Sequence, residues 1–323
     1  MYGDKGAERL AARDREAAAA AFREITEDSD IEPEVRIEAA ERLARFDERA
    51  AAQALRELAG DSGVGPELRL DAAERLALVD RRLAASAFHT IAGDSGAGSR
   101  IRAEAAGLLT GLDEGLAAQA FHGIADDPGA DSSLRIEAAE LLMALDRRLA
   151  ASAFHTIAGD SDMDPRIRAD AAEVLTGLDE RLAALVFHTI ADACDVEPRI
   201  RVEAAEVLAG LDERLAAEVF RGIADDVDID ADLRIEAADG IVGLDRQSAA
   251  EAFGSIADDA GVDPVSRLEA ASMMHDLTER PGGEAFGAGW AGSRRPPSMR
   301  VQRPVSPMRP GRPPRPMRQP VPR

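Results

Sequence analysis

Apolar and polar positions along the chain repeat with a period of 33 residues. Each copy contains an arginine that is followed three and four residues later by paired alanines, and one aromatic or leucine column keeps the same step. A constant period of this length is typical of a solenoid, in which every unit packs on its neighbours. The repeated arginines are Arg36, Arg69, Arg102, Arg135, Arg168, Arg201, Arg234 and Arg267.

Each unit predicts two helices. Apolar residues recur at helical spacing across Pro66–Val79 and again from Ala84 to Ile91. Asp80 stands before the second run and predicts an N-cap, and the same column holds Asp from Asp14 to Asp245. Because neither helix could bury its apolar stripe alone, neighbouring units must stack. We therefore predict an all-α fold, an α-solenoid of about eight 33-residue two-helix repeats.

The last part of the chain has a different composition. Residues 281–323 hold nine arginines, one acidic residue and 11 of the 17 prolines, and carry a net charge of +8, against −30 for residues 1–280. Such a segment cannot bury a core, so we expect a disordered or extended tail. The predicted domains are a solenoid over residues 1–280, with a degenerate first repeat at 1–35, and an Arg/Pro-rich tail at 281–323.

One helix of the unit resembles a known family. Residues 165–175, with their apolar-Arg, Ala-Ala and Leu pattern, resemble the second helix of a HEAT repeat of the short bacterial, bilin-lyase-like type. Asp160 and Arg168 resemble the Asp and Arg with which that family ties adjacent units together, and Ala193 interrupts the Asp column. The resemblance implies that this helix lines a concave surface. It implies no activity, because the scaffold hosts many roles.

The same helix carries an acidic stripe. The second residue after the repeated arginine is acidic in all eight copies, and the fifth is acidic in most. Positions three apart share a helix face, so the resemblance implies an acidic groove that binds a protein with a basic or extended segment. The alternative is a solvated face whose charges serve solubility. The candidate binding residues are Glu38, Asp71, Glu104, Glu137, Asp170, Glu203, Glu236 and Glu269, with Glu140, Glu173, Glu206 and Asp239.

The tail has an internal period of nine residues. A polyproline II helix has about three residues per turn, so this period returns each Met-Arg pair to one side at intervals of about 28 Å. This arrangement indicates a linear motif, or a segment that contacts the acidic helices of its own or a neighbouring molecule. The alternative is low-complexity drift. The pairs are Met299 and Arg300, Met308 and Arg309, and Met317 and Arg318.

Three other patterns have weaker functional readings. Four histidines repeat with the same period, His89, His122, His155 and His188, which predicts a row of imidazoles along the surface. Neighbouring imidazoles in such a row are too far apart to share a zinc ion. The alternative is a pH-responsive role in binding. The Gly-Asp-Ser-Gly segments at 60–63 and 93–96 predict turns rather than a hydrolase motif. Alternate aspartates at 226–232 resemble the start of a calcium loop but lack its glycine, so N-capping is the preferred interpretation.

These observations favour a non-catalytic interaction scaffold. No catalytic combination of residues breaks the symmetry of the repeat, the only cysteine is Cys194, and we expect neither a metal nor another cofactor. The negative body disfavours nucleic acid as its partner, and no apolar run predicts a membrane span, so we expect a cytoplasmic protein. The alternatives are a HEAT-like enzyme, such as a bilin-lyase-like or DNA-glycosylase-like protein, and an acidic DNA mimic.

Overall fold

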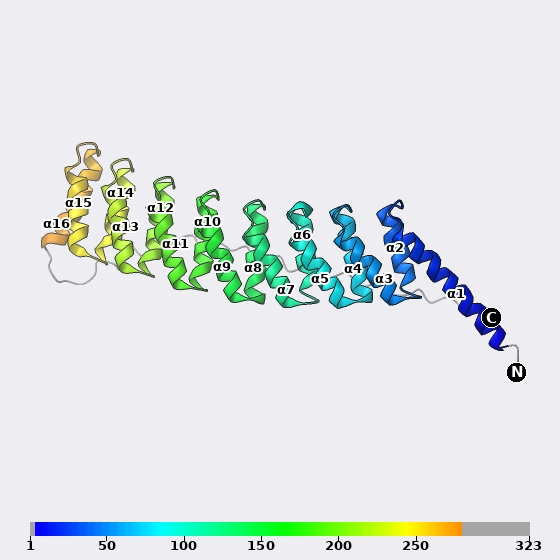
Figure 1. Ribbon diagram of the computed structural model, residues 1–323. Helices are drawn as coiled ribbons and strands as arrows, with labels where there is room; N and C mark the ends of the chain where they lie inside the picture. The colour runs from blue at the N-terminus through cyan, green and yellow to red at the C-terminus, as the bar shows by residue number, and fades with distance from the viewer. Residues whose placement is uncertain (1–3, 280–323) are drawn as a thin grey trace, which may run out of the picture. The chain divides into compact units, whose positions relative to one another are not determined.

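The computed structural model describes residues 4–279, which form sixteen α-helices, one short 3-10 helix (η1, Ser95–Ala97) and no strand. Consecutive helices pair into two-helix units, which confirms the predicted all-α solenoid (Figure 1). The helices are α1 (Asp4–Glu27), α2 (Pro33–Leu43), α3 (Glu48–Gly60), α4 (Pro66–Val79), α5 (Arg81–Ala92), α6 (Ser99–Leu109), α7 (Glu114–Ala125), α8 (Ser132–Leu145), α9 (Arg147–Gly159), α10 (Pro165–Thr176), α11 (Glu180–Asp192), α12 (Pro198–Ala209), α13 (Glu213–Asp225), α14 (Ala231–Val242), α15 (Arg246–Asp258) and α16 (Pro264–Glu279).

The chain divides into two units, Met1–Leu277 and Thr278–Arg323. The first holds the solenoid. The predicted tail, with its disorder and its Met-Arg pairs, falls on residues 281–323, which lie outside the described residues together with residues 1–3.

The helices of the solenoid form two layers. Each helix packs mainly on the helices one and two places away in the chain, so that odd-numbered helices follow one another in one layer and even-numbered helices in the other. The apolar core runs between the layers, from unit to unit. Contacts are therefore local in sequence along the whole solenoid.

Small and aromatic residues share this core. Of the apolar residues that recur at helical spacing across Pro66–Val79, Leu70, Ala73 and Leu76 are buried and Ala77 is half-buried. The alanine pairs let neighbouring helices approach closely, and one large ring per unit fills the space that remains. These rings are at most 2% exposed and belong to Phe88, Phe121, Phe154, Phe187, Phe220 and Phe253.

Aspartate caps start the odd-numbered helices. The Oδ1 atom of Asp80 accepts hydrogen bonds from the backbone N–H groups of Arg82 and Leu83, both at 3.0 Å. The prediction of a cap at Asp14 is wrong, because α1 begins at Asp4 and continues through that residue. Residues 7–13 are strong helix formers without Gly or Pro, so nothing in the sequence stops the helix there. The observed caps are Asp47, Asp80, Asp113, Asp146, Asp179, Asp212 and Asp245.

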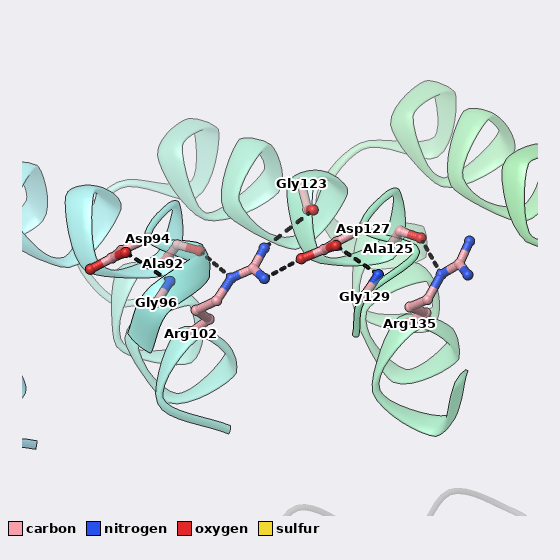
Figure 2. A network of polar contacts seen from close by, with 9 residues as sticks. All are labelled: Ala92, Asp94, Gly96, Arg102, Gly123, Ala125, Asp127, Gly129 and Arg135. Atoms are coloured by element: carbon pink, nitrogen blue, oxygen red, sulfur yellow. Dashed lines mark hydrogen bonds and ion pairs between the residues drawn. The ribbon is translucent and has the colours of Figure 1, made fainter. Parts of the chain in front are cut away.

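Buried arginines join successive units (Figure 2). The Nε atom of Arg102 donates a hydrogen bond to the carbonyl oxygen of Ala92 at 3.0 Å, which ties α6 to α5. From here on, an odd-numbered helix and the even-numbered helix that follows it are counted as one unit. Its Nη1 atom donates to Oδ2 of Asp127, in the interhelix loop of the next unit. The other oxygen of Asp127 accepts a hydrogen bond from the backbone N–H of Gly129 at 2.9 Å. One carboxylate therefore holds its own loop and the arginine of the preceding unit.

The same Arg–Asp contact recurs at five junctions. The guanidinium beside each carboxylate holds the pKa of Asp94, Asp127 and Asp160 below its ordinary range, and the backbone N–H of the loop lowers it further. The pKa of Asp259 is lowered for the same reasons. The pairs are Arg69–Asp94 (2.5 Å), Arg102–Asp127, Arg135–Asp160 (2.6 Å), Arg201–Asp226 (3.5 Å) and Arg234–Asp259 (2.8 Å).

The series is interrupted in the middle of the solenoid. Arg168 is 4% exposed and its Nε atom donates to the carbonyl oxygen of Ala158 at 3.1 Å, as in the other units. The position that should pair with it in the next unit is Ala193. Within residues 4–279, Arg168 has no carboxylate partner. This junction keeps the cation and lacks the anion.

Candidate binding surface on the even-numbered helices

The acidic stripe lies at the surface of the even-numbered helices. On α10, Asp170 and Glu173 are exposed, whereas the neighbouring Ala171 and Ala172 are buried in the core. The other members of the stripe are exposed as well, except for the half-buried Asp71 and Glu236. The burial pattern thus separates a core side from an acidic side on each of these helices.

Arginines neutralise the stripe near its N-terminal end. Arg75 on α4 pairs with Asp71 on its own helix, at 3.0 Å, and with Glu41 on α2. Arg42 pairs with Glu38 one turn earlier on α2. On α6, the guanidinium of Arg100 lies 3.5 Å from the carboxylate of Glu104.

Further along the chain, a single arginine forms ion pairs with carboxylates of the acidic stripe. Arg199 on α12 contacts Glu203 on its own helix at 3.2 Å and Glu236 on α14 at 2.7 Å. The carboxylates raise the pKa of Arg199, although its partial burial acts in the opposite direction. Glu206 and Asp239 lie one turn further along the same two helices and make no ion pair within residues 4–279.

The middle of the stripe has no such cation. Glu137 and Glu140 on α8, and Asp170 and Glu173 on α10, make no ion pair with any residue of the described part of the chain. We call these four residues the central acidic patch. The carboxylates of the middle units lack a cation because the positions equivalent to Arg42 and Arg75 hold apolar residues there.

The environment disfavours the ionised form of several of these carboxylates. Partial burial raises the pKa of Asp170, and the neighbouring Glu173 raises it further, although Arg166 opposes this. Burial and Glu236 raise the pKa of Glu206, and burial alone raises that of Asp239. A cation that approached these groups would relieve their repulsion, so the surface favours cationic ligands.

Burial also raises the pKa of Glu74, and the negative charges of Asp71 and Glu104 raise it further. Glu104 belongs to the next unit, so like charges act on one another from unit to unit along the stripe.

Apolar side chains accompany the carboxylates. Leu141 follows Glu140 directly and lies one helical turn after Glu137, which places it beside the central acidic patch. Leu141 is 43% exposed, and the equivalent residues Leu108 and Val207 are 36% and 38% exposed. A ligand on this surface would meet carboxylates and an aliphatic side chain in each of these units.

The histidines occupy a less uniform setting than the predicted surface ladder. His155 is exposed, whereas His89, His122 and His188 are half-buried. Nδ1 of His122 lies 3.2 Å from Oδ2 of Asp126, and its Nε2 atom is buried without a hydrogen-bond partner in the described residues, as is Nδ1 of His89. The odd-numbered helices that carry these histidines also pack against one another, so the exposed fraction of each imidazole depends on the neighbouring units as well as on its own helix.

The Gly-Asp-Ser-Gly segments form turns, as predicted. Oδ1 of Asp61 accepts a hydrogen bond from the backbone N–H of Gly63 at 2.8 Å, and Asp94 and Gly96 repeat this contact at 2.9 Å. In the aspartate-rich loop, Asp226 makes the same contact to the backbone of Asp228 at 3.1 Å and also pairs with Arg201.

Metal and membrane features were sought in the same part of the chain. Within residues 4–279, no group of three or more His, Cys, Asp or Glu side chains has an arrangement that could hold a metal ion. Cys194 is a free, exposed thiol. None of the described helices combines the length and apolar content that crossing a membrane requires.

The six residues of the predicted Met-Arg motif, Met299, Arg300, Met308, Arg309, Met317 and Arg318, lie outside the described residues. The sequence matches no protein-family profile, and no curated protein is significantly similar to it.

Proposed function

We propose that this protein is a non-catalytic scaffold whose even-numbered helices bind an extended, arginine-rich polypeptide. The observation that carries the proposal is the central acidic patch, where four carboxylates from two successive units form no ion pair within residues 4–279. Arginine side chains of a partner would supply the missing charge, and the exposed Leu108, Leu141 and Val207 would contact its apolar residues.

The repeat supports the same class of function. Stacked two-helix units present one helix of each unit along a continuous surface, which suits the recognition of extended polypeptides. We propose a HEAT-like classification on the residues that resemble that family. The proposal assigns no catalytic residue.

The chain contains a segment with the chemistry of the proposed partner. Residues 281–323 combine nine arginines with regularly spaced methionines and many prolines. An extended polyproline segment loses little conformational freedom on binding, which favours such a ligand. A peptide of this sequence is therefore the first ligand to test, and an equivalent segment of another protein is the second.

The experiment measures binding of a fluorescent peptide with the sequence of residues 281–323 to a protein that ends at Arg280, whose helical content is checked by circular dichroism. The test variant neutralises the central acidic patch as Glu137→Gln, Glu140→Gln, Asp170→Asn and Glu173→Gln. The control variant changes the net charge equally on exposed sites of the odd-numbered helices, as Glu48→Gln, Glu114→Gln, Glu180→Gln and Glu213→Gln.

We expect the test variant to bind at least about fourfold more weakly than the control, because four exposed ion pairs contribute about 0.2–1 kcal/mol each and about 1.4 kcal/mol corresponds to tenfold. Binding should also weaken as salt is added. Equal affinities of the test and control variants would refute the proposed surface.

A further inference from the structure

The interrupted junction between α10 and the loop that follows α11 has the donors of a binding site. At a regular junction such as Arg135–Asp160, the carboxylate accepts two hydrogen bonds. One comes from the arginine of the preceding unit, at 2.6 Å, and the other from the backbone N–H of Asp162, at 3.1 Å. These two donors define the geometry that a carboxylate requires at this place.

Both donors remain where Ala193 replaces the aspartate. The guanidinium of Arg168 uses its Nε atom for Ala158 and makes no other hydrogen bond within residues 4–279. The backbone N–H of Asp195, two residues after Ala193, likewise has no acceptor in the described residues. The turn is otherwise retained, since the N–H of Val196 donates to the carbonyl oxygen of Ala193 at 3.2 Å, as Met163 does to Asp160 at 3.1 Å.

The side chain of Arg168 is held in place. The residue is 4% exposed, like Arg135 at 3% and Arg234 at 2%, so the packing of the unit fixes the guanidinium in the position that binds a carboxylate elsewhere. The outer nitrogens of this guanidinium make no hydrogen bond to the described residues, so they can donate to an anion that reaches them. The arginine is therefore already arranged for a ligand.

A second cation contributes to the same place. Asp160 is stabilised by Arg135, with which it pairs, and also by Arg168 of its own unit, and Asp94, Asp127 and Asp259 are each stabilised by two arginines in the same way. By the same arrangement, a carboxylate at position 193 would lie between Arg168 and Arg201. Asp192 and Asp195 flank the position, but both are exposed and neither forms an ion pair with Arg168.

The place is open to solvent on one side. The side chains of the equivalent aspartates keep 20–34% of their surface exposed, so a small ligand can reach the position from outside. Ala193 keeps the Cβ atom and lacks only the carboxylate, so a ligand here must lie at van der Waals distance from Cβ, on the solvent side, and have the size of a short carboxylic acid.

We propose that this junction, which we call the Arg168 site, binds a small aliphatic monocarboxylate of the size of acetate. One oxygen of the ligand accepts hydrogen bonds from the Arg168 guanidinium and the other accepts one from the backbone N–H of Asp195. The bound carboxylate completes the series of Arg–Asp contacts between the two halves of the solenoid. The Arg168 site is separate from the central acidic patch, so either proposal can fail without the other.

The test is an NMR titration of the full-length, ¹⁵N-labelled protein with sodium acetate at constant ionic strength. We expect the Asp195 amide and the Arg168 Nε–H signals to shift and to saturate in the millimolar range, because a ligand with only four heavy atoms makes few contacts. Sodium chloride is the parallel titrant, and the Arg135 Nε–H signal at a regular junction serves as an internal control.

Two variants make the result decisive. Ala193→Asp supplies the carboxylate covalently, so it should remove the acetate response while the fold is retained. Ala193→Ser has a side chain without charge and should keep the response. Failure of the Asp195 and Arg168 signals to saturate with acetate would overturn the proposal. An unchanged response in Ala193→Asp, or an equal response to chloride, would overturn it too.

Discussion

The junctions on the two sides of α10 use the same arginine column in different ways. On the N-terminal side, Arg135 reaches Asp160 and the contact is complete. On the C-terminal side, Arg168 is buried to the same degree, but Ala193 stands where its partner would be. The comparison teaches that the packing of alanines and phenylalanines is sufficient to bury a guanidinium, and that the carboxylate is an additional contribution to the junction.

The largest effect is expected when the complete junction is converted into the incomplete one. Asp160→Ala leaves Arg135 buried without a carboxylate, and hydrogen bonds to charged groups contribute about 1.5–3 kcal/mol, so we expect a loss of about 2 kcal/mol in the free energy of unfolding. Urea unfolding followed by circular dichroism measures it. Asp162→Ala, an exposed residue of the same loop, should cost a few tenths of a kcal/mol. Equal losses would mean that the ion pair contributes nothing.

The reverse substitution should give a smaller gain. Ala193→Asp is expected to stabilise the protein by about 1 kcal/mol, because the new side chain is partly solvated and pairs with one guanidinium. The gain should depend on pH. By analogy with Asp160, whose pKa Arg135 lowers, the gain is present above the ordinary aspartate pKa of about 3.9 and is lost as the pH falls through the lower pKa of the folded state.

Ala193→Asn tests the origin of this gain. Its amide can accept the same hydrogen bonds without a charge, so its effect should be smaller and should not change with pH in this range. A gain that is as large for Asn as for Asp at neutral pH would assign the effect to hydrogen bonding alone.

The smallest effect is expected at the surface of α10 itself. The pKa of Asp170 is raised, in contrast to that of Asp160, so ionisation of Asp170 disfavours the folded state. Asp170→Asn should therefore stabilise the protein slightly at neutral pH, by a few tenths of a kcal/mol because the site is largely solvated. This gain should vanish as the pH falls below the pKa values of both states. A loss of stability at neutral pH would show that the carboxylate has a structural role.

Much of the fold follows from the sequence because the determinants are local. Helical spacing of apolar residues, proline at the start of one helix and aspartate before the other define each unit without knowledge of its neighbours. The wrong prediction at Asp14 arose because the repeat pattern was applied without regard to the residues that precede it. A cap is only used when the preceding residues leave the helix, and those before Asp14 do not.

The candidate binding surface was less predictable. The sequence identifies the acidic column but not which carboxylates are already paired, since Arg75 and Arg199 reach into adjacent units and their targets depend on how neighbouring helices align. A usable signal was present, because Arg42 and Arg75 stand four residues after the acidic column and are replaced by Leu108 and Leu141 later in the chain. At Leu141 the replacement coincides with unpaired carboxylates, whereas Glu104 in the unit of Leu108 is paired with Arg100 instead.

The local nature of the contacts has a consequence for how the molecule unfolds. Since helices of the solenoid pack mainly on chain neighbours, cooperativity passes from one unit to the next only through the junction that joins them. The junction at Ala193, which lacks its ion pair, is therefore a place where we expect the array to divide into two blocks that open independently. A ligand or a single substitution there would set the length over which the solenoid behaves as one folding unit.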